Sequence, residues 1–146
     1  MIKTTLTLIT ILCISLTAMS QTQDSLTVNG DKVFYKVEKE AMFPGGPTGW
    51  RKYLEANLNV DLASKYMKLK RKEKIAQQTA KLQFIVDKEG NISNVTCINA
   101  SEIHPKLVQE SIRVIKEGPR WEPALQNGKH VIYQAIQYIT WQVSAD

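Results

Sequence analysis

The chain has 146 residues, of which 43% are hydrophobic and 23% charged, so it can form one ordinary domain and does not have the composition of a disordered chain. Its formal net charge is +5, and most of the excess positive charge falls between residues 65 and 74. We interpret this basic stretch as the solvated face of a helix, and expect no nucleic-acid partner.

The first 20 residues have the three-part plan of a secretory signal peptide. A basic start at Lys3 is followed by an apolar run over residues 6–18 and by small residues at Ala18 and Ser20. A spanning helix needs about 20 apolar residues, and this run is shorter. We therefore expect cleavage after residue 20, a periplasmic protein, and no stable membrane span after cleavage. The mature chain would keep one thiol, Cys97, and hence no internal disulfide.

The next elements are predicted by turn signals and periodicity. Residues 26–37 favour two short strands around Asn29-Gly30, a strong tight-turn signal. The segment Phe43-Pro44-Gly45-Gly46 predicts a fixed bend, after which apolar residues at helical spacing indicate a helix from about Pro47 to Asn57. Residues 63–75 predict a second, basic helix.

The second half of the chain predicts a hairpin, a helix and a long strand. Residues 80–86 alternate in polarity, Asp87-Lys88-Glu89-Gly90 is a turn, and residues 92–98 form the second strand. A helix opens at His104-Pro105 and ends at Gly118-Pro119. Residues 129–143 lack Pro and Gly and predict the longest strand, in a domain over residues 26–146.

The predicted helix that opens at His104-Pro105 has an apolar stripe that should pack on the sheet. We expect it to face Leu82, Phe84 and Val86 of the first hairpin strand. Its members are Leu107, Val108, Ser111, Ile112 and Ile115.

Several of these motifs, taken in order, resemble one known family. They are Phe43-Pro44-Gly45-Gly46, Lys52-Tyr53-Leu54-Glu55-Ala56-Asn57-Leu58, Phe84-Ile85-Val86-Asp87-Lys88-Glu89-Gly90-Asn91-Ile92, Pro119-Arg120-Trp121-Glu122-Pro123-Ala124 and Gln126-Asn127-Gly128-Lys129. The chain resembles the TonB C-terminal domain family, in the variety that begins with Phe-Pro-Gly-Gly. The resemblance covers most of residues 34–142.

The resemblance implies an α+β fold and a non-enzymatic, protein-binding function. The expected fold is an antiparallel three-stranded sheet, made of a hairpin, a helix and a long final strand, with an extra N-terminal helical segment. The TonB-box segment of an outer-membrane receptor would pair as an added strand with the final strand, or a second copy would pair there as a homodimer. The predicted partner-binding residues are Val131, Ile132, Tyr133, Gln134, Ala135, Ile136, Gln137, Tyr138 and Ile139.

Three departures from the family pattern accompany this resemblance. A full TonB has an uncleaved anchor and a long Pro-rich spacer, and neither is expected here, so the chain alone would not couple to the inner-membrane motor. Val60-Asp61 replaces a common Tyr-Pro after the first helix. Residues 75–79 replace the usual glycines before the hairpin, which predicts a different approach to the sheet.

Enzymatic and metal-binding functions have weak support. His104 and His130 share no ligand spacing with Cys97, and Gly45-Gly46 lacks the Lys-Ser/Thr of a phosphate loop, so no cofactor or metal is expected. A periplasmic carbohydrate- or peptidoglycan-binding domain remains the alternative. It would use exposed tryptophans, above all Trp50 or Trp141 beside a cleft, together with the basic stretch.

Overall fold

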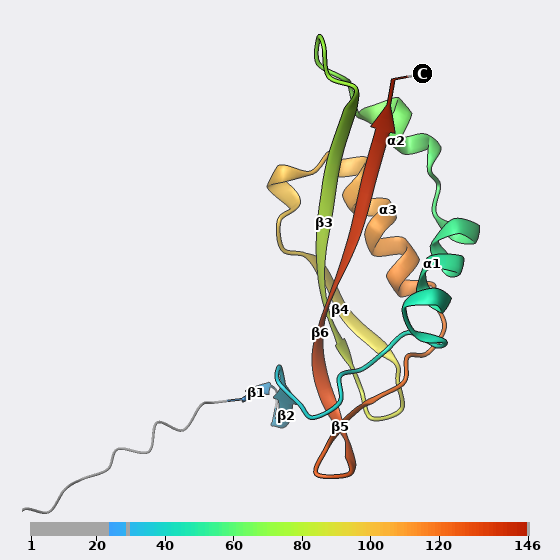
Figure 1. Ribbon diagram of the computed structural model, residues 1–146. Helices are drawn as coiled ribbons and strands as arrows, with labels where there is room; N and C mark the ends of the chain where they lie inside the picture. The colour runs from blue at the N-terminus through green and yellow to red at the C-terminus, as the bar shows by residue number, and fades with distance from the viewer. Residues whose placement is uncertain (1–23, 29, 146) are drawn as a thin grey trace, which may run out of the picture.

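The computed structural model describes residues 24–28 and 30–145, and these form helices and one mixed, curled sheet (Figure 1). The fold is therefore of the α+β type. The helices are α1 (Gly46–Asn57), α2 (Asp61–Tyr66) and α3 (Pro105–Lys116), with a short 3-10 turn at Ala100–Glu102. The strands are β1 (Ser25–Val28), β2 (Asp31–Phe34), β3 (Ile75–Val86), β4 (Ile92–Cys97), β5 (Ala124–Gln126) and β6 (Lys129–Ser144).

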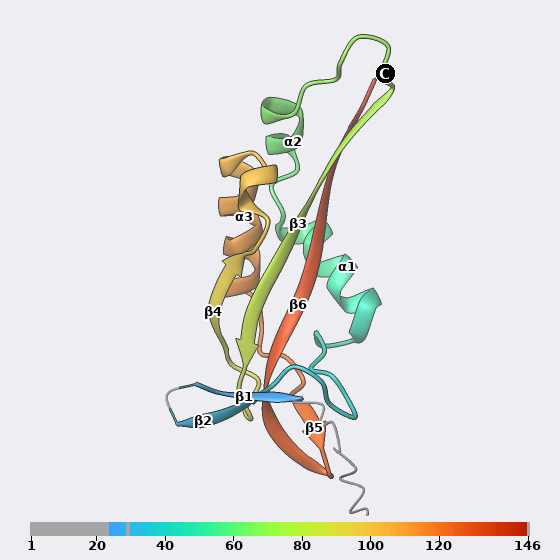
Figure 2. The ribbon, with the colours of Figure 1, turned by 90° about the vertical axis from the view of Figure 1, so that its left-hand side faces the viewer.

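The centre of the sheet is a long twisted ribbon of β3 and β6. These strands pair antiparallel from Ile75↔Ser144 to Val86↔Tyr133, over the whole length of β3. In Figures 1 and 2, α3 and α2 lie on one side of this ribbon and α1 lies beside β6. The prediction that the final strand is the longest is confirmed, since β6 has 16 residues.

The β3–β4 hairpin also forms as predicted. The backbone N–H of Glu89 and that of Asn91 both donate to Oδ1 of Asp87, at 2.9 and 2.8 Å. This arrangement closes the turn, and Gly90 supplies the positive φ of 85° that the turn needs. The alternation of β3 then buries Ala80, Leu82, Phe84 and Val86 on the helix side.

The sheet is larger than the predicted three antiparallel strands. Within the described residues it has six strands in the order β1-β2-β6-β3-β4, with β5 paired to β6. The antiparallel arrangement expected from the resemblance describes its β4-β3-β6 part. β2 instead runs parallel to β6, through Val33↔Ile132 and Phe34↔Tyr133. A parallel pairing between segments so far apart in the chain has no local sequence signal.

The predicted basic helix over residues 63–75 is wrong for most of its length. Helix α2 ends at Tyr66, residues 67–74 form a loop with Lys72 at a φ of 76°, and β3 begins at Ile75, before the predicted residue 80. Residues 75–79 thus extend the sheet. They do so because β6 continues to Ser144 and offers them a complete strand to pair with.

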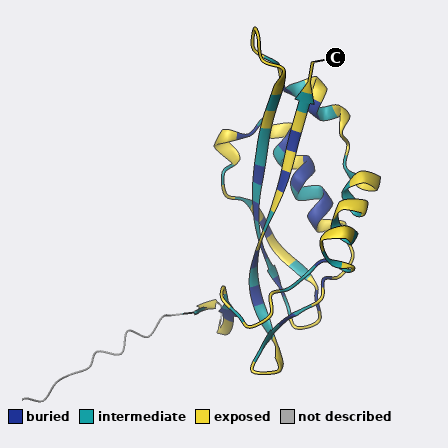
Figure 3. Cartoon of the chain, viewed as in Figure 1, coloured by how far each residue is buried: buried dark blue, intermediate teal, exposed yellow. Residues whose placement is uncertain are grey.

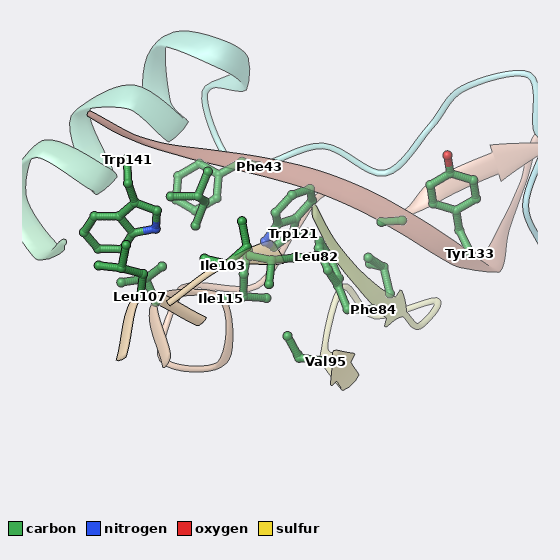
Figure 4. Packing of buried hydrophobic residues seen from close by; sticks show 14 of the residues in the cluster. Phe43, Leu82, Phe84, Val95, Ile103, Leu107, Ile115, Trp121, Tyr133 and Trp141 are labelled. Carbon is green, nitrogen blue, oxygen red and sulfur yellow. The ribbon is translucent and has the colours of Figure 1, made fainter. Parts of the chain in front are cut away.

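The core lies between the helix side of the sheet and α3 (Figures 3 and 4). Leu82, Phe84 and Val86 pack with Leu107 and Ile115 of α3, as predicted. The buried stripe of α3 is, however, rotated relative to the prediction: Val114 and Glu110 are buried, whereas Val108 and Ile112 are half-buried. Glu110 on this buried stripe accepts a hydrogen bond from the backbone N–H of Asn59 in the α1–α2 connection.

Candidate protein-binding site

One long edge of β6 has backbone groups that no strand uses. On the side opposite β3, β2 pairs with Ile132 and Tyr133, whereas β5 pairs with residues 129–131, before the β3 pairing begins at Tyr133. From residue 134 to residue 144, the described part of the chain provides no second strand partner. Alternate residues of an antiparallel strand point their N–H and C=O groups away from the paired neighbour. We call residues 134–144 the open edge.

The structure divides the predicted binding residues into two groups. Val131 pairs with β5, Ile132 and Tyr133 pair with β2, and all three precede the open edge. The remaining ones, from Gln134 to Ile139, lie on the open edge.

The two faces of the open edge differ in character. Ile136 and Tyr138 are 43% and 54% exposed and lie on the face away from the core. Ala135 and Ile139 are buried on the helix side. Gln137, which lies between them on the same face, is polar and half-buried. Sequence periodicity indicates this alternation, because it assigns odd-numbered residues to one face.

A pocket of about 180 Å³ opens beside Gln137. Its other walls come from the Phe-Pro-Gly-Gly segment, the start of α1 and the segment before β5. The main lining residues are Met42, Phe43, Pro47, Trp50 and Trp121. The sequence predicts a bend at Phe43-Pro44-Gly45-Gly46 but not its role as a pocket wall, since nothing local places it next to β6.

An aromatic cluster holds this pocket in place. The centroid of the Phe43 ring lies 5.2 Å from that of Trp50 and 5.9 Å from that of Trp121, and both pairs are edge-on. The ring centroids of Trp121 and Phe84 are 5.0 Å apart. The Tyr53 hydroxyl donates to the carbonyl oxygen of Val114 at 2.9 Å, which ties α1 to α3. Burial raises the pKa of Tyr53, so this donor keeps its proton at neutral pH.

Charged side chains lie near both ends of β6. At the C-terminal end of β6, the Ala145 N–H donates to the carbonyl oxygen of Lys74 at 2.9 Å, so the basic loop of residues 67–74 joins the sheet on the β3 side of β6. Near the start of β6, the exposed Glu38 and Glu40 lie in a segment that also carries the exposed Lys36 and Lys39. Burial, together with Glu40, raises the pKa of Tyr133 to about 12.

The tryptophans and histidines are the residues that the sequence offers as candidates for sugar or metal binding. Trp141 is 2% exposed and Trp121 6%, so neither presents a free face to a sugar, and Trp50 is half-buried in the aromatic cluster. His104 caps α3 by accepting from the Lys106 N–H at 3.3 Å, and its ring stacks on Tyr66. His130 is exposed on β6. The described residues contain no group of three His, Cys, Asp or Glu side chains that could hold a metal ion.

Comparison with known families decides the class of this domain. The profile described as "Gram-negative bacterial TonB protein C-terminal" matches residues 65–143. The chain belongs to this TonB C-terminal family. The match runs from α2 through the open edge to residue 143, but the Phe-Pro-Gly-Gly segment precedes it. A comparison with curated proteins gave no match.

Family membership carries a general function. TonB C-terminal domains are non-enzymatic interaction modules of energy transduction and transport in the Gram-negative cell envelope, and their partners are typically outer-membrane receptors. The carbohydrate-binding alternative gains no support from this match. In the portion of the chain that the structure describes, no helix is long and apolar enough to cross a membrane. The predicted signal peptide lies outside the described residues.

Proposed function

We propose that this domain binds an extended segment of a protein partner as an added strand along the open edge, and that the partner is the TonB-box segment of an outer-membrane receptor. The observation that carries the proposal is the unpaired side of β6 from Gln134 onward, opposite a completely paired β3. Strand addition satisfies free N–H and C=O groups with backbone hydrogen bonds, and side chains on alternate positions supply selectivity.

The test is an NMR titration of the mature domain with TonB-box peptides. We expect amide shifts concentrated at residues 134–144, because new hydrogen bonds form there. Shifts confined to the tryptophans and the basic loop, with the open edge unmoved, would contradict strand addition.

A matched pair of proline variants tests the backbone contribution. Gln134 and Gln137 are three positions apart, so the N–H of one points to β3 and that of the other to the open side. Proline at the position facing β3 removes a ladder hydrogen bond and should lower the melting temperature. Proline at the other position should leave the fold intact and abolish peptide binding. If both variants fold and bind like the parent, the added strand does not use these groups.

A second copy of the domain competes for the same surface. An open strand edge is prone to self-pairing, and β6 offers a long one. We expect any homodimer to dissociate when a binding peptide is added, which sedimentation velocity measures. A dimer that keeps its mass while peptide is bound would place the dimer contact elsewhere.

The proposed location is the periplasm, after removal of residues 1–20. Intact mass of the protein recovered from a Gram-negative host should correspond to a chain that begins at Gln21. Recovery of the full-length chain in the inner-membrane fraction would instead point to an anchored domain.

A further inference from the structure

We propose that the edge of β3 opposite β6, at residues 75–79, is a second strand-addition site, and that its partner is an extended acidic segment of another protein. We call this stretch the β3 edge. It lies on the other side of the β3–β6 ribbon from the open edge, so it does not depend on the TonB-box assignment. Two features carry the proposal, the free backbone groups of the β3 edge and the lysines that lie beside them.

The β3 edge has no strand partner because β4 is too short to cover it. β4 pairs with β3 only from Leu82 to Val86, whereas β6 pairs with β3 from Ile75 onward. Within the described residues, no other strand pairs with this part of β3. Residues 75–79 are therefore paired on one side alone.

The hydrogen bonds of Asn99 show which residues point their backbone groups to the unpaired side. Its side-chain amide accepts from the Lys81 N–H at 2.9 Å and donates to the Thr79 carbonyl oxygen at 3.0 Å. Odd-numbered residues of β3 therefore direct their N–H and C=O groups away from β6. Asn99 takes the place of a strand at this end of the β3 edge. Beyond it, no described group bonds to the N–H or C=O of Gln77 or to the N–H of Thr79.

A groove runs along the β3 edge. One hollow of about 390 Å³ lies between β3 and residues 99–103, and another of about 310 Å³ lies between β3 and the basic loop of residues 67–74. Gln77 and Gln78 line both hollows, so the two meet at the middle of the β3 edge. An extended chain that pairs with Gln77 would lie in this groove.

The loop side of the groove is basic. Lys68 and Lys70 line its hollow together with Glu73, whose carboxylate accepts from the Lys70 N–H at 3.1 Å within the loop. In the other hollow, one base and one acid balance each other, Lys81 and Glu102. The basic side chains of the loop are exposed, and none makes an ion pair with a described residue; they are Lys68, Lys70, Arg71, Lys72 and Lys74. Acidic side chains on an added strand would complement this charge.

The same features argue against two other occupants. A second copy that pairs edge to edge through β3 would bring two basic loops together, and like charges across an interface oppose association. A phospholipid headgroup has no row of N–H and C=O groups, so it would leave the backbone of Gln77 unpaired. An acidic extended segment satisfies both the backbone groups and the lysines.

The first test uses two hexapeptides blocked at both ends, Thr-Glu-Val-Glu-Val-Thr and the same sequence with Gln in place of Glu. NMR follows hydrogen exchange of the protein amides with each peptide. We expect the Glu peptide to slow exchange at Gln77 and Thr79, whose N–H groups gain acceptors, and to leave Gln78, which is bonded to β6, unchanged. Its affinity should exceed that of the Gln peptide about five-fold at low salt. This advantage should disappear at about 1 M salt, where the Debye length is about 3 Å.

A matched pair of proline variants separates the two edges of the ribbon. Gln77 on β3 is directly opposite Gln142 on β6, and each directs its N–H away from the other strand. Gln77→Pro removes a donor of the β3 edge and should abolish binding of the Glu peptide, whereas Gln142→Pro removes a donor of the open edge and should preserve it. Thermal melting shows whether each variant folds, and hydrogen exchange in the parent protein decides the question if Gln77→Pro unfolds. Binding that survives Gln77→Pro in a folded protein overturns the proposal.

Two double charge reversals test the role of the basic loop. Lys68→Glu with Lys70→Glu should weaken binding of the Glu peptide about ten-fold at low salt. Lys88→Glu with Lys129→Glu changes the net charge equally, on the β3–β4 turn and at the start of β6, which lie at the opposite end of the ribbon (Figure 1). This control should weaken binding by less than about two-fold. Equal losses would assign the effect to net charge and overturn the role of the loop.

Four further outcomes would each overturn the proposal. If no peptide slows exchange at Gln77 and Thr79, the β3 edge does not add a strand. Equal protection by the Glu and Gln peptides would mean that the groove does not select acidic partners. Binding to anionic phospholipid vesicles that requires Lys68 and Lys70, without peptide protection of Gln77, would assign the loop to a lipid surface. A dimer that Gln77→Pro dissociates would identify a second copy as the occupant.

These outcomes leave the proposed function untouched. The TonB-box titration is followed at residues 134–144, on the opposite edge of the ribbon, and Gln142→Pro perturbs that edge alone. Either site can therefore fail while the other is retained.

Discussion

The indole N–H of Trp141 on β6 donates to the hydroxyl oxygen of Ser111 on α3 at 3.0 Å, and both residues are buried. Ser111 in turn donates to the carbonyl oxygen of Leu107 at 2.7 Å. These hydrogen bonds give the indole N–H of Trp141, the one polar group of this large buried side chain, an acceptor. It also fixes the distal half of β6, which carries the open edge, against α3.

We expect Ser111→Ala to lower the free energy of unfolding by roughly 1 to 3 kcal/mol, because the indole N–H is left buried without an acceptor. Ser64→Ala is the matched control, since Ser64 is exposed and makes a similar bond to the Asp61 carbonyl oxygen within α2. The control should change stability by less than about 0.5 kcal/mol. Urea denaturation measures both, and equal midpoints would mean that the indole finds another partner.

Phe84→Ala should cost roughly 3 to 5 kcal/mol of unfolding free energy, as truncations of large core residues do. Phe84 is fully buried, and its ring packs edge-on against Trp121. The control is Ile136→Ala on the opposite face, which is 43% exposed and should cost less than about 1 kcal/mol. Similar melting temperatures for the two variants would show that the faces of the sheet are wrongly assigned.

Glu110 connects α3 to the α1–α2 connection. Its carboxylate accepts from the Asn59 N–H at 2.9 Å and from Arg113 at 2.8 and 2.7 Å. The Arg113 hydrogen bonds, joined by that of Asn59 and opposed by burial, hold the pKa of Glu110 below its ordinary value of 4.5. Glu110→Gln should therefore cost roughly 1 to 3 kcal/mol at pH 7.

The same contact predicts a pH dependence with a definite sign. Because the folded-state pKa of Glu110 lies below the unfolded value, its contribution is complete above about pH 4.5 and is lost as the pH falls through the folded-state pKa. The difference in stability between the parent and Glu110→Gln should thus shrink below pH 4.5. Chemical denaturation at pH 7, 4.5 and 3 tests this. A difference that grows on acidification would mean that the carboxylate is not paired in the folded state.

Gly90 is expected to tolerate no side chain. Its φ is 85°, and an added Cβ would overlap the carbonyl oxygen of Trp121, with which the turn is in backbone contact. Gly90→Ala should cost more than about 2 kcal/mol. Gly128 has a φ of 69° but open space around it, so Gly128→Ala isolates the conformational strain and should cost about 1 kcal/mol. Equal costs would mean that the Trp121 segment moves away without penalty.

Local sequence patterns predict that the β3–β4 hairpin, α3 and β6 form, but not where β3 begins or which residues of α3 are fully buried. Alternation identifies the buried face of β3 at Leu82 and Phe84, and the Asp87–Gly90 turn chemistry ends the strand. The stop at Gly118-Pro119 bounds α3. These features depend on interactions between residues close in sequence, which is why the pattern alone determines them.

Only the tertiary structure determines where the open edge begins and what lies beside it. Lysine favours helices, and the apolar residues between 66 and 75 have near-helical spacing, yet residues 75–79 join the sheet because β6 provides hydrogen-bond partners for them. The parallel contact of β2 with Ile132 and Tyr133 closes the first part of the β6 edge, and Phe43 and Trp50 meet Trp121 to form the pocket at Gln137. These pairings join segments that are distant in the chain, and their energies depend on burial and on backbone partners that no local pattern specifies.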